Sequence, residues 1–88
     1  MSAVIYTKTH CPYCTRAKAL MDSRGIVYQE LIIGVADPQS LKLKPNQQLC
    51  TREQLLSAYP DAKTVPQIWL HGTHIGGYDH LVAHLSAE

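Results

Sequence analysis

The spacing of apolar residues along the chain predicts alternating strands and helices. Residues 3–6 form a continuous apolar run, which is typical of a strand covered on both faces. A helical spacing follows over residues 12–24, and Gly25 stands where a helix usually ends. The residues predicted to share its apolar stripe are Tyr13, Ala17, Leu20 and Met21. Residues 26–33 are rich in β-branched side chains, so we expect a second strand joined to the first by a right-handed parallel crossover.

The second half of the chain repeats this alternation after a long connection. Residues 34–50 carry turn signals and no sustained apolar pattern, and we interpret them as a loop. Thr51 and Gln54 have the spacing of a capping box, which predicts a short helix buried through Leu55, Leu56 and Tyr59. A strand over 67–70, a tight turn and a short partner strand over 74–75 come next, and residues 78–85 close the chain as a helix.

Composition narrows the class of protein. Eighty-eight residues suffice for one small domain, expected to span 1–88. A net charge of +1 argues against a polybasic surface for nucleic acid or membranes, and the N-terminal residues lack the apolar stretch of a signal peptide. Three cysteines, an odd number, do not suit a secreted disulfide scaffold. We therefore expect a reducing cytosol, where a Cys-x-x-Cys pair is reactive rather than structural.

The segment Cys11-Pro12-Tyr13-Cys14 is the main candidate for chemistry. Two cysteines three positions apart at a helix start lie on one face of its first turn, where their sulfurs can join and part. The helix N-terminus favours a thiolate at Cys11, as do Lys8 nearby and exposure at the loop. A strand, a Cys-x-x-Cys pair and a helix, in that order, are typical of a thiol–disulfide redox site.

Other cysteine and histidine residues invite a different interpretation. His80 and His84 are four residues apart on the last predicted helix, and with the cysteine pair they suggest a metal-binding module. Their separation of more than 60 residues from Cys14 does not match a zinc finger, in which the gap is about 12 to 15 residues. Cys50 has no partner at Cys-x-x-Cys spacing, and we interpret it as a passive thiol.

Four separated stretches make the chain resemble the glutaredoxins. They are residues 6–14 with Cys-Pro-Tyr-Cys, residues 16–20, the Thr-Val-Pro segment 64–66, and residues 75–81 with Gly-Gly-x-Asp-x-Leu. The resemblance implies an α/β, thioredoxin-like fold with a four-stranded mixed sheet flanked by three helices, in the order β-α-β-α-β-β-α. It covers the chain except residues 34–50, which are longer than in compact bacterial members. That insertion and the early end of the last helix resemble small phage-encoded glutaredoxins.

The resemblance also implies roles for individual residues. Cys11 is the expected nucleophile and Cys14 the resolving thiol. The residues that the resemblance implies for glutathione binding are Lys8, Tyr13, Thr64, Val65, Pro66, Gly77, Tyr78 and Asp79. Within this set, the Val65–Pro66 peptide bond is expected to be cis, and Asp79 to face the γ-glutamyl ammonium. The candidates for a second carboxylate contact are Lys63, Arg52 and Gln54.

The expected activity is glutathione-dependent reduction of protein disulfides and glutathione mixed disulfides. Glutathione is then a reducing co-substrate, with no tightly bound cofactor and no metal. Disulfide-containing proteins are the expected partners, with ribonucleotide reductase among them by resemblance, and we expect a cytoplasmic monomer, in the host cytoplasm if the source is a phage. Two alternatives stay open: an electron carrier driven by thioredoxin reductase, and a metal or iron–sulfur module, which Pro12 disfavours by resemblance.

Overall fold

The computed structural model of the protein describes residues 2–37, 39 and 41–87. Its strands are β1 (Ser2–Lys8), β2 (Val27–Ile33), β3 (Gln47–Leu49), β4 (Gln67–Leu70) and β5 (Thr73–Gly76). Its helices are α1 (Pro12–Ser23), α2 (Arg52–Ala58) and α3 (Tyr78–Ser86). Every predicted strand and helix is present, with bounds that differ by a few residues at most. Among the described residues, no helix is long and apolar enough to cross a membrane.

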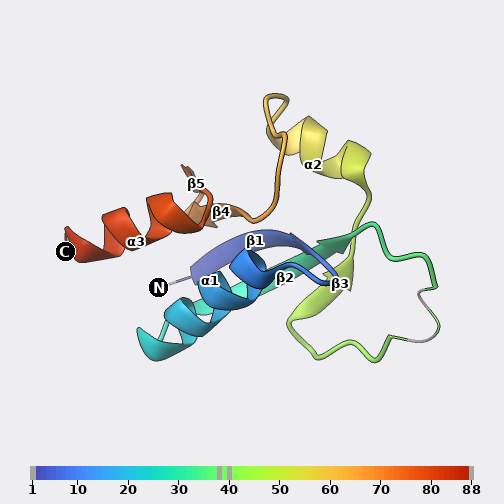
Figure 1. The fold of residues 1–88 in the computed structure, drawn as a ribbon, viewed down its shortest axis with the longest axis horizontal. Coiled ribbons are helices and arrows are strands. Elements are labelled where there is room, and N and C mark those ends of the chain that lie inside the picture. Colours follow the sequence, from blue (N-terminus) through green and yellow to red (C-terminus); the bar gives the residue numbers. More distant parts are fainter. Residues whose placement is uncertain (1, 38, 40, 88) are drawn as a thin grey trace.

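The sheet contains five strands in the order β3-β2-β1-β4-β5, so the prediction of four strands is wrong by one. β1 and β2 are parallel, which confirms the predicted crossover through α1, whereas β4 is antiparallel to both β1 and β5. The additional strand, β3, lies inside the segment predicted to be a loop. The chain leaves the sheet after Ile33 and returns at Gln47, where β3 pairs with the edge of β2 (Figure 1).

β3 could not be predicted from the sequence because its own residues lack the pattern of a strand. Gln-Gln-Leu is three residues long and has no apolar alternation. The pairing comes from β2 instead: the Glu30 N–H donates to the Asn46 carbonyl at 2.8 Å, and the Cys50 N–H donates to the Ile32 carbonyl at 2.8 Å. A neighbouring strand edge with unpaired backbone groups is enough to recruit such a segment.

Neighbouring residues of β1 point to opposite faces of the sheet and bury two separate cores. Ile5 lies on the face that α1 and α3 cover, and Tyr6 lies on the face that α2 covers. The buried residues of the first core are Ala3, Ile5, Ala17, Met21, Ile26, Ile68, Leu70, Leu81 and Leu85. Those of the second are Tyr6, Ile33, Leu55 and Ala62, with Trp69 packed at its margin.

The apolar stripe predicted for α1 is correct except at its first member. Ala17 and Met21 are fully buried, but Tyr13 is 55% exposed. Tyr13 lies in the first turn of α1 and lines a surface groove, where its ring sits near that of Tyr78, with ring centroids 6.1 Å apart.

The ends of α1 and α2 follow their sequence signals. Gly25 has a φ of +68°, its N–H donates to the Asp22 carbonyl, and the Ile26 N–H reaches back to the Met21 carbonyl, which together form a Schellman motif. Thr51 and Gln54 form the predicted capping box at the start of α2.

Candidate active site

The two cysteines of the Cys-x-x-Cys segment lie at the start of α1 and are joined by a disulfide. Cys11 is the N-cap of the helix, and its Sγ accepts a hydrogen bond from the Cys14 backbone N–H at 3.2 Å. Pro12 occupies the first helical position, where its missing N–H costs no helical hydrogen bond. The backbone of the first turn thus directs an N–H group at the Cys11 sulfur, an arrangement that favours negative charge there.

The two sulfurs differ in access. Cys11 is 9% exposed, which is less than its loop position predicts, because the Val65 carbonyl lies 3.9 Å from its Sγ. Cys14 is 2% exposed and lies one turn deeper, beneath Cys11. A reagent approaching from solvent therefore meets Cys11 first.

The segment opposite Cys11 contains a cis peptide bond between Val65 and Pro66, as expected. Pro66 is buried, Thr64 is exposed and Val65 is half-buried. The segment precedes β4, which pairs with β1, and this pairing holds it beside the loop that carries Cys11.

A groove of about 530 Å³ lies beside this segment. It brings together, among others, seven of the residues implied for glutathione: Tyr13, Thr64, Val65, Pro66, Gly77, Tyr78 and Asp79. These residues come from the first turn of α1, the segment before β4 and the start of α3. One continuous surface therefore runs from the active-site helix to the N-terminus of α3.

Lys8 lies outside this groove, at the end of β1. It lines a small cavity of about 70 Å³ together with Arg52, Lys63, Thr64 and Val65. Three cationic side chains thus converge beside the Val65 end of the groove, which makes this cavity suited to an anionic group. The side chain of Gln54, the third candidate for a carboxylate contact, instead caps α2: its Oε1 accepts a hydrogen bond from the Thr51 N–H.

Comparison with known proteins identifies the family. The family model for glutaredoxin matches residues 3–75. The chain belongs to the glutaredoxin family. It is 44% identical over 79 residues to glutaredoxin 3 of Escherichia coli (strain K12), covering 90% of this chain and 80% of that protein. It is 42% identical over 79 residues to glutaredoxin 1 of Rickettsia bellii, covering 89% of this chain and 70% of that protein.

Solved glutaredoxin structures share the fold. Glutaredoxin 1 of Francisella tularensis, complexed with cacodylate, superposes with a TM-score of 0.69 at 27% identity and covers 98% of this chain and 93% of its own. A buckwheat glutaredoxin–glutathione complex has a TM-score of 0.69 at 29% identity and covers 97% of this chain and 68% of its own. The fold is therefore the expected thioredoxin-like one, and the protein is a glutathione-dependent thiol–disulfide oxidoreductase with Cys11–Cys14 as its redox-active pair.

Within this glutaredoxin, Gln67 and His74 support the groove although the sequence did not indicate them. His74 Nε2 lies 2.8 Å from Gln67 Oε1, and Gln67 Nε2 donates to the Thr64 carbonyl at 2.9 Å. The His74 ring stacks on Tyr59, with centroids 4.0 Å apart. Burial, together with the nearby His80, lowers the pKa of His74. In the sequence, Gln67 is a polar residue at the start of an otherwise apolar strand, and this position does not indicate that its side chain contacts His74 or Thr64.

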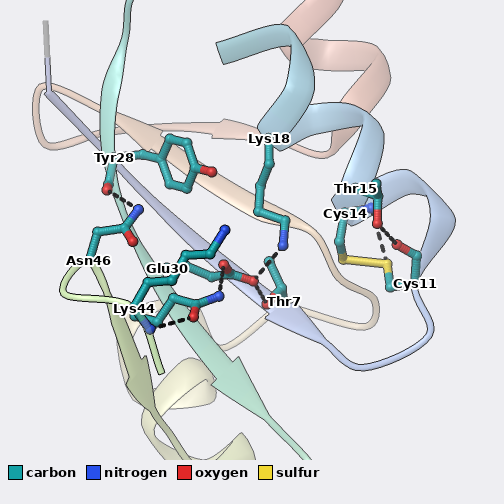
Figure 2. A network of polar contacts seen from close by, with 10 residues as sticks. Thr7, Cys11, Cys14, Thr15, Lys18, Tyr28, Glu30, Lys44 and Asn46 are labelled. Atoms are coloured by element: carbon teal, nitrogen blue, oxygen red, sulfur yellow. Dashed lines mark hydrogen bonds and ion pairs between the residues drawn. A yellow bond between two sulfur atoms is a disulfide. The ribbon is translucent and has the colours of Figure 1, made fainter. Parts of the chain in front are cut away.

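Glu30 is the second residue that the sequence did not indicate. It is 3% exposed in the middle of β2, and three side chains donate to its carboxylate: Thr7 Oγ1 at 2.7 Å, Gln47 Nε2 at 2.9 Å and Lys18 Nζ at 3.0 Å. Figure 2 shows Lys18 reaching from α1 to Glu30 on the side of the sheet that carries the disulfide. Burial acts to raise the pKa of Glu30, but the three hydrogen bonds and the positive charge of Lys18 together outweigh it, so the net pKa is lowered.

Cys50 keeps its predicted place as a thiol outside the active site. It is free and half-buried, and its Sγ–H donates to the Thr51 carbonyl at 3.5 Å. Burial raises the pKa of the Cys50 thiol, and the hydrogen bond to Thr51 offsets only part of that rise. Within residues 2–37, 39 and 41–87, no three His, Cys, Asp or Glu side chains gather around a point where they would hold a metal ion.

Proposed function

We propose that Cys11 is the nucleophile and Cys14 the resolving thiol of this glutaredoxin. The Cys11 thiolate attacks a substrate disulfide, the substrate S–S bond breaks, and one substrate thiolate leaves and takes up a proton. The Cys14 thiolate then attacks Cys11 Sγ, the second substrate thiol leaves, and the Cys11–Cys14 disulfide closes. Two electrons have passed from the protein to its substrate.

Two glutathione molecules restore the dithiol in this proposal. The first attacks Cys11 Sγ, which releases the Cys14 thiol and leaves glutathione joined to Cys11. The second attacks the sulfur of that bound glutathione, the bond to Cys11 Sγ breaks, and Cys11 is released as a thiolate while glutathione disulfide leaves, so two electrons have passed from glutathione to the protein. Position supports the choice of Cys11, since it is the more accessible sulfur and lies at the helix N-terminus.

The groove beside Cys11 is the proposed glutathione site. A peptide-like ligand lying in it can pair with the Val65 N–H and C=O as one added strand. Gly77, Tyr78 and Asp79 at the start of α3 are proposed to hold the γ-glutamyl end, because helix N-terminal N–H groups bind carboxylates. Lys8 is proposed to receive the glycyl carboxylate in the small cationic cavity.

The remaining groove residues are proposed to shape this site. Tyr13 presents an exposed ring next to the incoming disulfide, while Thr64 and Pro66 hold Val65 against Cys11. The observation that carries the proposal is the position of the Val65 carbonyl, 3.9 Å from Cys11 Sγ at the edge of the groove. The buckwheat glutaredoxin, a relative of the same fold, is a complex with glutathione, which supports a glutathione site here.

Partners and location are proposed on the same basis. We infer that residues 1–88 act as one domain and a monomer in the cytoplasm, on proteins with disulfides or glutathione mixed disulfides. Ribonucleotide reductase is a proposed partner by family resemblance, since its catalytic disulfide must be reduced in every cycle. The net charge of +1 is the reason for expecting neither nucleic acid nor a membrane as a partner.

The test is glutathione-dependent reduction of a small glutathione mixed disulfide, coupled to glutathione reductase. We expect wild type to turn over, Cys11→Ser to lose activity, and Cys14→Ser to keep much of it, because a single thiol suffices for a mixed disulfide. On a protein disulfide, in contrast, Cys14→Ser should be strongly impaired, since the second step then lacks its nucleophile. Cys50→Ser is the matched control, as it removes the thiol outside the site.

Two outcomes contradict the proposal. Activity that survives Cys11→Ser but not Cys14→Ser would reverse the two roles. A wild-type protein that is inactive with glutathione but turns over with thioredoxin reductase would replace the glutathione site with the alternative of a reductase-driven carrier.

A further inference from the structure

The buried thiol of Cys14 shares a cavity with a lysine of the same helix. Cys14 and Lys18 are four residues apart on α1, so their side chains lie on one face of the helix as direct neighbours. Both line a cavity of about 520 Å³ that also includes Cys11 and Glu30 and shares no lining residue with the proposed glutathione groove. The ammonium of Lys18 is thus the cation that α1 itself brings to the side of Cys14.

Glu30 holds that ammonium in place. Lys18 Nζ lies 3.0 Å from Glu30 Oε2, and its side chain is 27% exposed, so the charge is partly withdrawn from water. Thr7 and Gln47 occupy further positions around the same carboxylate. A lysine with a buried, fixed partner keeps one position, whereas a solvated lysine samples many. Figure 2 shows this arrangement, with Lys18 between the disulfide-bearing turn and Glu30.

We propose that the Lys18 ammonium, positioned by Glu30, stabilises the thiolate of Cys14 and so accelerates the resolving step. This inference rests on the proposed role of Cys14. In that step Cys14 gives up its thiol proton to water, attacks Cys11 Sγ and forms the new S–S bond, while the bond from Cys11 to the substrate sulfur breaks. The leaving substrate thiolate takes up a proton, so charge and electrons balance.

The need for such a cation follows from burial. A thiol that is 2% exposed ionises less readily than a solvated one, and an adjacent positive charge offsets that cost. Besides Cys11 and Cys14 themselves, the charged and titratable groups that line this cavity are Lys8 at the end of β1, His10 from the β1–α1 loop, Lys18 from α1 and Glu30 from β2. Glu30 opposes the effect of Lys18, so the inference assigns the acceleration to the ammonium and only the positioning to the carboxylate.

The size of the effect follows from thiol reactivity. An opposite charge beside an ionisable group changes the population of its charged form by about tenfold to hundredfold, so loss of the ammonium should lower the fraction of Cys14 present as thiolate by a factor in that range. The more basic thiolate is also a better nucleophile, which recovers about the square root of that loss. The resolving step should therefore slow by about threefold to tenfold.

The experiment measures that step directly in a single turnover. Reduced protein is mixed with glutathione disulfide, quenched with acid, and the dithiol, the glutathione mixed disulfide and the Cys11–Cys14 disulfide are separated by intact mass spectrometry. All proteins carry Cys50→Ser so that only the two active-site thiols remain. We expect Lys18→Met to accumulate the mixed disulfide, to close it about threefold to tenfold more slowly, and to need a higher pH for the wild-type rate. Lys18→Arg should restore the rate.

Two further variants separate charge from folding. Lys18→Met with Glu30→Gln removes both buried charges and avoids an unpaired carboxylate, and it should be as slow as Lys18→Met. Glu30→Gln alone keeps the ammonium and an amide oxygen to accept from it, so closure should be as fast as in wild type or faster. Lys42→Met, which removes an exposed lysine before β3, is the control and should leave closure unchanged.

The proposal is overturned if the Lys18→Met protein has the circular dichroism spectrum of the folded wild type and still converts the mixed disulfide to the Cys11–Cys14 disulfide at the wild-type rate and with the wild-type pH profile. It is also overturned if Glu30→Gln slows closure while Lys18→Met does not, because the carboxylate and not the ammonium would then be the active group. Failure of the proposed function is a separate result: in that case the Cys14→Ser protein would still reduce a protein disulfide, whatever Lys18 does.

Discussion

Replacing Thr7 with valine tests whether the buried carboxylate of Glu30 contributes to stability. Thr7 is buried on β1, and its Oγ1 donates the shortest of the three hydrogen bonds to Glu30, at 2.7 Å. Valine keeps the β-branched shape but has no donor. A hydrogen bond to a charged group contributes about 1.5 to 3 kcal/mol, and the additional buried methyl group returns part of that. We expect Thr7→Val to reduce the free energy of unfolding by about 1 to 2 kcal/mol at pH 7.

The loss should depend on pH in a direction set by Glu30. Its pKa is lowered in the folded protein, so the ionised carboxylate contributes stability that is present above its ordinary value of 4.5. That contribution disappears as the pH falls through the lower, folded value. Without the Thr7 donor, the folded pKa of Glu30 moves back up. The difference between variant and wild type should therefore be constant near neutral pH and shrink as the pH falls below 4.5.

Urea denaturation followed by circular dichroism, from pH 7 down to the lowest pH at which both proteins fold, measures this difference. The melting temperature at pH 7 should fall by about 5 to 15 °C for a domain of this size. Ile5→Val is the matched control, because it removes one methylene from a fully buried residue of the same strand and should cost about 1 kcal/mol at every pH. A Thr7→Val loss that stays the same at every pH, or that is below about 0.5 kcal/mol at pH 7, would refute the reasoning.

Two other variants probe the groove. Gln67→Leu removes both hydrogen bonds by which Gln67 joins His74 to the Thr64 carbonyl, so the segment before β4 is held less firmly. We expect KM for a glutathione mixed disulfide to rise about threefold to tenfold. An unchanged KM would show that these hydrogen bonds do not position the segment. Gly76→Ala places a Cβ 2.7 Å from His80 Nδ1 at a φ of +121°, and should cost about 2 kcal/mol in urea denaturation. Adding His80→Ala should recover the steric part of that cost but not the backbone part, and no recovery would mean that the clash is not the cause.

The redox site could be predicted almost entirely from the sequence because its geometry is local. A Cys-x-x-Cys pair at a helix start lies within one helical turn, so the spacing of Cys11 and Cys14 already implies sulfurs within bonding reach. The helices with a clear apolar period, such as α1 and α3, could be predicted for the same reason. Their side chains repeat along the chain with the geometry of the element itself.

Contacts between distant segments could not be predicted in this way. β3 forms because the edge of β2 offers partners to a segment without a strand pattern of its own. Tyr13 is exposed although it shares the helical spacing of Ala17 and Met21, because burial depends on what lies opposite and not on period alone. The place of Val65 beside Cys11 required family resemblance, since 54 residues separate the two in sequence.

The redox pair, the helix that positions it and the order of strands and helices could be predicted from the sequence, because each depends on residues that are neighbours along the chain. The charges that surround that pair are known only from the way the helices pack on the sheet. In the sequence, Glu30 is a single acidic residue in a predicted strand and Lys18 is an ordinary lysine of a predicted helix. Packing of α1 against β2 brings Lys18 Nζ to 3.0 Å from Glu30 Oε2. A buried charge is tolerated only where other elements supply its partners, and those partners are set by packing and not by spacing along the chain.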